Sequence, residues 1–399
     1  MPSASTTGSI TRIADSEAGG MPAPENAQAW LALALTRGLG PRRIEALIDA
    51  FGSAALWVEH SDADLRACGL ASGLIHALRN PEAEPLARCQ KWLQAPEHHL
   101  VTLDDELYPP LLRQIADPPP VLFVVGNPDV LVTPQIAIVG SRSATPGGID
   151  HARSFAATLA RAGFTITSGL AAGVDGCAHQ GCLDTGGLTI AVVGTGPDQV
   201  YPARHKKLAR EIIASGALVS IFPPGTEVRP GNFPARNRVI SGMSLGTLVI
   251  EAGVRSGSLI TARLATEQGR EVFAIPGSVH NPQARGCHLL IRQGAKLVET
   301  ADEIIEELAP LAGELAGVLQ QLLALPDHDG LDKSTHPPHI DNDPEYDRLI
   351  EAIGFEPTPV DEIIRRSELT TAAVSSMLLI MELDGRVIAH PGGRYSRSA

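Results

Sequence analysis

Ser141 and Arg142 stand at a turn of this sequence that could bind an anion. They follow the apolar run QIAIVG (135–140) and precede an expected helix, in the stretch GSRSATPGG (140–148). A dinucleotide site at such a turn needs G-x-G-x-x-G and an acidic residue after the next strand. This turn has a single glycine, and the next strand ends TITSGLAAG without an acid. The hydroxyls, the guanidinium and the N–H groups of a helix start therefore predict a phosphate site, with a surface ion pair of Arg142 as the alternative.

The ends of the next two apolar runs add small residues and cations. The stretch SGLAAGVDG (168–176) brings Ser168 and Gly169 to the same expected crevice, and Asp175 is expected to cap the following helix. The stretch YPARHKKLAR (201–210) carries a run of cations, namely Arg204, Lys206, Lys207 and Arg210. By itself this run is equally consistent with a solvated basic face.

A further loop combines cations with an aromatic residue. The stretch FPARNRVISG (233–242) begins at Phe233 and carries Arg236 and Arg238, and Phe222 lies upstream, in a chain that is only 4% aromatic. Cations beside exposed rings suit a single-stranded nucleic acid, whose bases stack on such rings with about 1–3 kcal/mol each. The competing interpretation places the phenylalanines in the core, and we expect it to hold for one of them.

Cys177, His179 and Cys182 invite a zinc interpretation, which their spacing does not favour. The three positions do not share one helical face, and no second pair of ligands is spaced to complete a tetrahedron. Neither a metal nor another cofactor is therefore expected. The five cysteines are few and irregularly spaced, which favours a reducing cytoplasm, and no stretch approaches the length of a membrane-spanning helix.

Short apolar runs alternate with helical stretches to position these loops. The runs are 135–140, 164–169, 188–194, 217–223, 246–252 and 271–277. Helical stretches such as 151–163, 206–216 and 256–269 separate them. This order predicts an α/β fold with an extended, Rossmann-like, doubly wound parallel sheet. Its ligand crevice would lie at the carboxyl ends of the strands.

Shifts in composition divide the chain into five expected parts. They are a disordered tail (1–25), a helical module of the SAM or helix-hairpin-helix type (26–95), the Rossmann-like domain (100–310), a linker (311–342) and a winged-helix domain (343–399). The third helix of the last part is poor in basic residues, so a structural or partner-binding role is at least as well supported as DNA reading.

The net charge of −13 argues against a protein that coats duplex DNA by bulk electrostatics. The distribution of charge is uneven, however, because residues 228–250 contain no acid and three arginines. A local basic channel on an acidic protein is therefore expected.

Seven strings of this sequence resemble the DNA-processing family DprA, also called Smf. In order over about 160 residues they are GSR, SGLAAGVDGCAH, GTGPDQVYP, FPARNRVISG, EAGVRSGSLITA, VFAIPG and GCHLLIRQGAKLV. The resemblance implies a non-catalytic homodimer that binds single-stranded DNA without sequence preference. It also implies that the protein helps to load the RecA recombinase onto DNA during natural transformation.

The resemblance also implies site residues, with Arg142 and Lys206 as the leading phosphate contacts. The implied DNA-binding residues are Gly140, Ser141, Arg142, Ser168, Gly169, Lys206, Lys207, Phe233, Arg236, Asn237, Arg238, Ser256 and Gly257. The implied dimer surface comprises His288, Leu289, Leu290 and Ile291.

Two other functions remain open at this point. Arg236 and Glu251 also look like the phosphate-binding arginine and the acid of a nucleotide phosphoribohydrolase, although a strand-end carboxylate bonded to loop amides or arginines is the simpler explanation of Glu251. A winged-helix regulator of duplex DNA would require sequence preference and a binding role for residues 340–399.

Overall fold

The computed structural model describes residues 24–322 and, further on, 348–350, 352–353, 358–367, 369, 374, 377–378, 381, 387–390 and 394–397. The chain divides into two compact units, 1–324 and 325–399. The predicted tail, up to residue 23, and the predicted linker from residue 323 onward lie outside the described residues. The helix that ends the first unit runs through residue 322, so the expected boundary at 310 falls within it.

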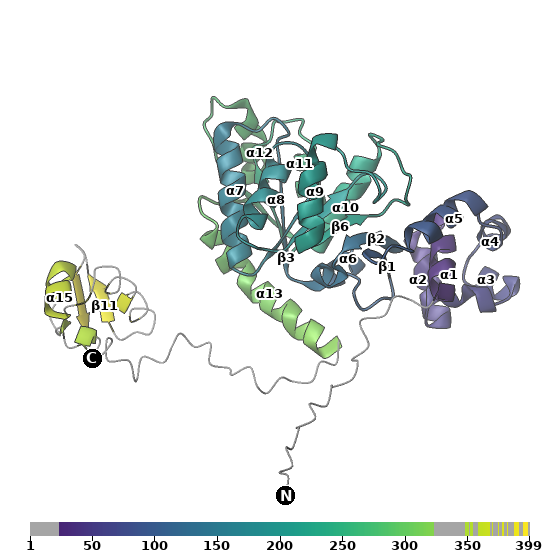
Figure 1. Ribbon diagram of the computed structural model, residues 1–399, viewed down its shortest axis with the longest axis horizontal. Helices are drawn as coiled ribbons and strands as arrows, with labels where there is room; N and C mark the ends of the chain where they lie inside the picture. The colour runs from purple at the N-terminus through teal and green to yellow at the C-terminus, as the bar shows by residue number, and fades with distance from the viewer. Residues whose placement is uncertain are drawn as a thin grey trace, which may run out of the picture. The chain divides into compact units, whose positions relative to one another are not determined.

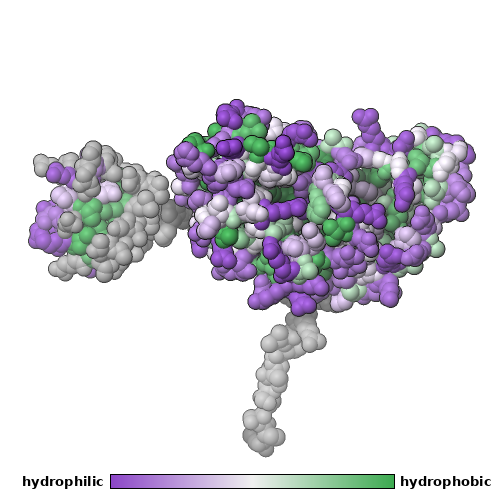
Figure 2. Space-filling view, turned by 90° about the horizontal axis from the view of Figure 1, so that it is seen from above, coloured by the Kyte–Doolittle hydropathy of each residue, from purple (hydrophilic) through white to green (hydrophobic). Residues whose placement is uncertain are grey.

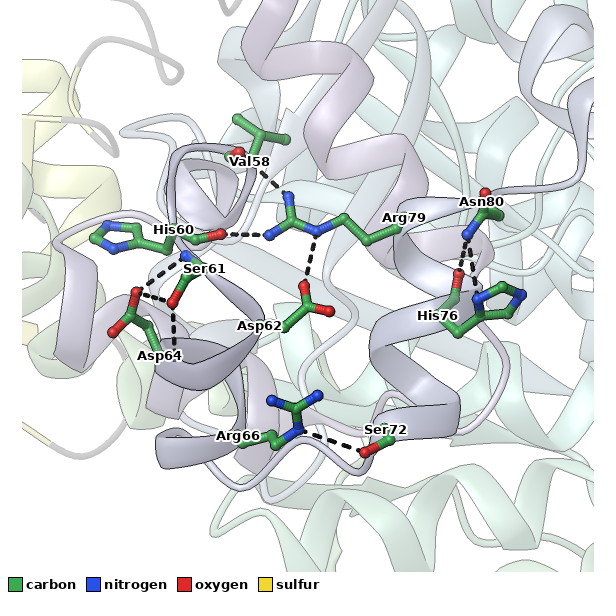
Figure 3. A network of polar contacts seen from close by, with 10 residues as sticks. All are labelled: Val58, His60, Ser61, Asp62, Asp64, Arg66, Ser72, His76, Arg79 and Asn80. Atoms are coloured by element: carbon green, nitrogen blue, oxygen red, sulfur yellow. Dashed lines mark hydrogen bonds and ion pairs between the residues drawn. The ribbon is translucent and has the colours of Figure 1, made fainter.

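Helices alone form the N-terminal part of the first unit. They are α1 (Pro24–Leu35), α2 (Pro41–Phe51), η1 (Ala54–Glu59), α3 (Asp62–Ala67), α4 (Ser72–Arg79) and α5 (Ala83–Trp92). The α1–turn–α2 pair confirms the predicted helix, hairpin and helix. Arg79 at the end of α4 donates hydrogen bonds to the carbonyl oxygens of Val58 and His60 and pairs with Asp62, as Figure 3 shows. These bonds hold α4 against the η1–α3 connection.

A nine-stranded sheet forms the centre of the unit (Figure 1). Its strands are β1 (His98–Thr102), β2 (Val121–Gly126), β3 (Gln135–Gly140), β4 (Thr165–Ser168), β5 (Thr189–Val193), β6 (Ala217–Ser220), β7 (Gly246–Ile250), β8 (Glu271–Ala274) and β9 (Lys296–Leu297). The order across the sheet is β1-β2-β6-β5-β4-β3-β7-β8-β9. The six predicted strands β3 to β8 are confirmed and pair in parallel.

Beyond the six predicted strands, the sheet is antiparallel at one edge. β2 pairs antiparallel with both β1 and β6. The reason is the connections, because a parallel neighbour requires a long crossover, usually a helix on the sheet face. Only the four-residue α6 (Pro110–Arg113) lies between β1 and β2, and only η2 (Pro128–Val132) separates β2 from β3.

Helices cover both faces of the sheet. They are α7 (Pro146–Arg161), α8 (Val174–Leu183), η3 (Ala203–His205), α9 (Lys206–Ser215), α10 (Asn232–Met243), α11 (Ser258–Glu267), η4 (Pro282–Ala284), α12 (Arg285–Arg292) and α13 (Asp302–Leu322). Alternate residues of β3 show the two faces: Ile138 belongs to the same buried cluster as Phe155 of α7, whereas Val139 belongs to the cluster of Val239 of α10. From β3 the chain adds β4, β5 and β6 on one side and then returns to add β7 and β8 on the other. A doubly wound sheet opens its ligand crevice at such a switch point, here between the parallel strands β3 and β7.

The surface of the first unit is mainly hydrophilic. On the face drawn in Figure 2, hydrophobic residues form small patches between hydrophilic ones. Tyr201, Val254 and Val279 are among the most exposed large hydrophobic side chains. No helix in the described ranges has the length and apolarity that crossing a membrane would require.

The second unit contains the described parts of a winged-helix domain. Its elements are β10 (Thr358–Pro359), α15 (Val360–Ser367), β11 (Val387–His390) and β12 (Arg394–Arg397). β11 and β12 pair antiparallel, which confirms the predicted hairpin, and β10 adds to the other edge of β12. Leu349, Ile363 and Met381 lie in its buried core.

Candidate nucleic-acid interface

A cleft of about 800 Å³ opens at the carboxyl ends of β3 and β7. Much of its lining comes from the end of β3 with its loop, from the first turns of α10, and from the loop between β7 and α11. Of the predicted residues, the structure brings eight together here: Gly140, Ser141, Arg142, Phe233, Arg236, Asn237, Ser256 and Gly257. The cleft therefore lies where the ligand crevice was predicted, at the carboxyl ends of the strands.

Two guanidinium groups lie beside one aromatic ring in this cleft. The Cζ atom of Arg142 is 5.4 Å from the ring centroid of Phe233, and that of Arg236 is 5.9 Å from it. The ring of Tyr201 is 6.1 Å from that of Phe233, at an angle of 51°. Cations at such distances interact favourably with an aromatic face. Phe222, the other phenylalanine considered, is half-buried and is not among the residues that line the cleft.

Arg236 is the buried cation of the cleft, with only 4% of its surface exposed. Its guanidinium lies against Gly169, where an added Cβ would be 1.5 Å from Nη1. Burial lowers the pKa of Arg236 to about 10, and the carboxylate of Asp175 opposes that shift. Its Nε has no hydrogen-bond partner among the described residues. A buried charge with an unmet donor is costly, so an anion in the cleft would stabilise this arginine.

Asp175 does not cap α8 as expected. The N-cap of α8 is Gly173, and Asp175 lies within the first turn. Its Oδ2 accepts hydrogen bonds from the backbone N–H groups of Gly169 (3.1 Å) and Ala171 (3.4 Å). Burial raises the pKa of Asp175, and the positive charge of Arg236 opposes that rise. Asp175 therefore fixes the loop before α8 and supplies the negative charge near Arg236.

Five predicted residues do not line the cleft: Ser168, Gly169, Lys206, Lys207 and Arg238. Ser168 is fully buried, and its hydroxyl donates to the carbonyl of Ile138 (2.6 Å). Gly169 lies against the guanidinium of Arg236, as described above. Arg238 lies about 200° around α10 from Arg236, and its Nη1 is 2.9 Å from Asp117 Oδ2.

The two lysines begin α9, directly after η3, and neither lines the cleft. Lys206 is exposed at the first position of α9. Lys207 Nζ lies 3.5 Å from Glu211 Oε1, one helical turn further along. Of the two implied leading phosphate contacts, the structure therefore places Arg142 in the cleft and Lys206 outside its lining.

The cleft contains residues that the sequence analysis did not select. Arg255, Ser258 and Thr261 line it from the β7–α11 connection and from α11, and Tyr201 lines it from the loop before η3. Arg255 lies in the loop after a buried strand, as Arg142 does. This position in the sequence could have indicated that Arg255 belongs to the same site.

Glu251 serves the backbone rather than the cleft. Its carboxylate accepts hydrogen bonds from the N–H (2.7 Å) and the hydroxyl (2.5 Å) of Thr145, the N-cap of α7. Glu251 is not among the residues that line the cleft with Arg236, so the hydrolase pair is not assembled. The simpler explanation, a strand-end carboxylate bonded to a loop amide, is confirmed.

The histidine and cysteines of α8 are packing residues. His179 is fully buried, and its Nδ1 lies 2.7 Å from the hydroxyl of Thr189. Burial lowers the pKa of His179 to about 3 and raises that of Cys182 to about 12. Within the described ranges, no three His, Cys, Asp or Glu side chains are grouped as a metal site requires.

The predicted dimer residues lie on α12. Leu290 is buried in the core, and Ile291 packs against it. His288 Nε2 lies 2.9 Å from the carbonyl oxygen of Gly277. Leu289 is half-buried and lines a second hollow, between α11 and α12, which shares Arg255, Ser256 and Ile260 with the cleft.

Comparison with known proteins identifies the family. The model of the family "DNA recombination-mediator protein A" matches residues 99–309, and that of the DprA winged helix domain matches 333–393. Protein Smf of Escherichia coli is 44% identical over 76% of this chain and 78% of its own length. Protein Smf of Synechocystis is 35% identical over 92% of this chain and 98% of its own.

A solved structure agrees with these matches. The X-ray structure of DNA processing protein A from Streptococcus pneumoniae has a TM-score of 0.62 and 34% identity, and covers 70% of this chain and 97% of its own. The chain therefore belongs to the DprA/Smf family of DNA recombination-mediator proteins, and it carries the winged helix domain of that family.

Proposed function

We propose that this protein binds single-stranded DNA without sequence preference and without catalysis, protects incoming DNA, and loads RecA onto it during natural transformation. The observation that carries the proposal is the placement of Arg142 and Arg236 beside the ring of Phe233 in one cleft. Membership of a family of DNA recombination mediators supports it.

The cleft offers both kinds of contact that a single strand needs. Arg142 is exposed, and a guanidinium can bind two phosphate oxygens at once. Phe233 and Tyr201 offer rings on which bases of any sequence can stack. Within a duplex the bases are stacked on one another, so their faces are not available to these rings. The cleft therefore favours single strands over duplexes.

Membership of the family supports both the homodimer and the RecA step. The hollow between α11 and α12, next to the cleft, also supports the homodimer. Val254, Ile260 and Leu289 place apolar surface in the hollow between α11 and α12. Such a hollow suits association with a second copy of the chain. We expect Leu289→Glu to shift the protein from dimer to monomer in sedimentation analysis. A wild-type protein that sediments only as a monomer would overturn this part of the proposal.

Fluorescence anisotropy with an unstructured oligothymidine and a matched duplex, across a series of salt concentrations, tests the central claim. We expect tighter binding to the single strand, with log K falling by about 0.7 per neutralised phosphate for each log unit of salt. Equal or tighter binding of the duplex would overturn the proposal. The RecA step is tested on single strands that are already covered by another single-strand binding protein. The lag before RecA hydrolyses ATP on these strands is measured, and this protein should shorten that lag.

A further inference from the structure

A third hollow, of about 470 Å³, lies over α8 between α7 and α9. We call it the α8 groove. Its lining comes from α7 (Ile149, Arg153), from α8 and its N-cap (Gly173, Gly176, Cys177, Gln180), and from η3 and α9 (Arg204, His205, Lys207, Leu208, Glu211). None of these lining residues belongs to the main cleft.

The groove exists because α8 lies deeper than the helices on either side. Seven of the ten residues of α8 are buried. At Gly176 an added Cβ would be 2.8 Å from Cε1 of His205, so a glycine here lets η3 approach closely. Small residues on α8 therefore form the floor, and α7 and α9 form the walls.

Cations dominate the lining of the groove. The lining contains three cations, Arg153, Arg204 and Lys207, and one carboxylate, that of Glu211. The Nζ atom of Lys207 forms an ion pair with this carboxylate at 3.5 Å. Asp150 is the nearest other acid on α7, and it is exposed rather than part of the lining. Arg153 and Arg204 are exposed and have no ion pair or hydrogen bond within the described part of the chain. On a protein of net charge −13, such a concentration of unpaired positive charge attracts a polyanion.

Only a thin ridge of backbone separates the α8 groove from the main cleft. Gly173 lines the groove, and an added Cβ there would be 2.2 Å from the carbonyl oxygen of Ser141. The N–H of Val174 donates to that same oxygen (3.1 Å). On the other side of this contact, Ser141 and Arg142 line the cleft. A strand that passes Arg142 therefore reaches Arg153 and Arg204 after crossing one layer of backbone.

We infer that the α8 groove binds the phosphates of the single strand as it leaves the main cleft past Arg142. This inference rests on the proposed function, because it requires a strand in the cleft. The groove has no Phe, Tyr or Trp in its lining, so it offers charge to the backbone and no platform for bases. Its contribution is therefore independent of sequence, sensitive to salt and limited to strands long enough to reach it.

Oligothymidines of six and thirty nucleotides test this inference with the full-length protein. The variant Arg153→Gln/Arg204→Gln removes two exposed cations and leaves the pair of Lys207 and Glu211 intact. We expect wild-type affinity for the short strand, at least a fivefold loss for the long one, and a salt slope reduced by about 1.4 on the long strand alone. The control, Lys91→Gln/Arg161→Gln, removes equal charge from exposed sites outside the main cleft and the α8 groove.

The outcomes separate the inference from the proposal beneath it. If the wild-type protein does not prefer single strands, the proposed function fails. If it does, and the groove variant matches the control on both strands, the inference is wrong and the proposed function stands. An equal loss on both strands would also overturn the inference, because the two arginines would then serve the cleft itself.

Cys177 supplies a second readout without any change to the arginines. Its thiol lies in the groove and is half-buried, whereas Cys89, Cys182 and Cys287 are buried. In a Cys68→Ala background, the thirty-nucleotide strand should slow alkylation of Cys177 more than the six-nucleotide strand does. Equal rates with both strands at saturation would contradict a strand in the groove.

Discussion

Arg79 in the N-terminal helices and Arg236 in the cleft each lie beside an aromatic ring, at 5.1 Å from Trp57 and 5.9 Å from Phe233. The two differ in what surrounds the guanidinium. Arg79 donates to two carbonyl oxygens and pairs with Asp62, so its donors are used within the module (Figure 3). Arg236 is more deeply buried and keeps an Nε without a partner among the described residues.

The difference teaches that an arginine beside a ring is not by itself a binding site. Where the backbone satisfies the donors, the pair stabilises a fold, as in the α4–η1 contact. Where a buried donor stays unmet and a second exposed arginine is at hand, the pair can gain from an incoming anion. The two regions therefore predict opposite responses to substitution, one in binding and one in stability.

Arg142→Ala gives the largest expected effect on the binding side. The side chain is exposed beside Phe233, so its loss removes a phosphate contact without opening the core. We expect affinity for oligothymidine to fall more than tenfold while the melting temperature stays at the wild-type value. Anisotropy and thermal unfolding measure the two quantities. Arg161→Ala, at the far end of α7, is the matched control, and equal affinities for the two variants would refute the role of Arg142.

Arg79→Ala should produce the reverse pattern. Three polar contacts are lost, and Arg79 is about one-third exposed, so we expect the free energy of unfolding to fall by about 1–2 kcal/mol. Affinity for oligothymidine should not change. Urea denaturation and anisotropy on the same preparation check both parts. A loss of affinity in a folded Arg79→Ala protein would erase the distinction between the two regions.

Acid should destabilise the folded protein through His179, which is buried on α8. Burial lowers its pKa in the folded protein to about 3, from an ordinary value of 6.5. Between pH 6.5 and pH 3, His179 is protonated in the unfolded chain and stays neutral in the folded protein. The free energy of unfolding therefore decreases as the pH falls from 6.5 toward 3. The slope is at most about 1.4 kcal/mol per pH unit. His179→Gln, which can still bond Thr189, should flatten this slope in urea denaturation at pH 7, 6 and 5, and an unchanged slope would assign it to other groups.

The sequence was sufficient for the parallel strands and for the position of the cleft, because buried strands with glycine or serine at their ends are a local pattern. It was not sufficient for the antiparallel edge, because β1 is short and carries two histidines, and its pairing depends on distant β2. The family resemblance implied Arg142, Phe233 and Arg236 as residues of one site, and the structure places both arginines beside the ring of Phe233. It did not show which neighbouring cations face the same way.

Arg238 and Lys206 illustrate two kinds of limit. The direction of Arg238 was accessible in principle, because two residues along a helix turn the side chain by about 200° away from Arg236. The direction of Lys206 was not, since it depends on how η3 joins α9. Asp175 was misassigned for a similar reason: its backbone partners lie in the loop that α8 folds back against.

Tyr201 offers the finest comparison between the two regions. Tyr201 is 47% exposed, and its ring is tilted by 51° against that of Phe233, whereas Trp57 is 5% exposed and lies in the core. Full stacking of a base is worth about 1–3 kcal/mol, and a tilted, half-exposed ring should supply the lower part of that range. Tyr201→Leu should therefore weaken binding of oligothymidine two- to fivefold, and Tyr201→Phe and Trp57→Phe should leave it unchanged. A loss with Tyr201→Phe would mean that the hydroxyl, and not the ring, contacts the strand, because that substitution keeps the platform and removes only the polar tip.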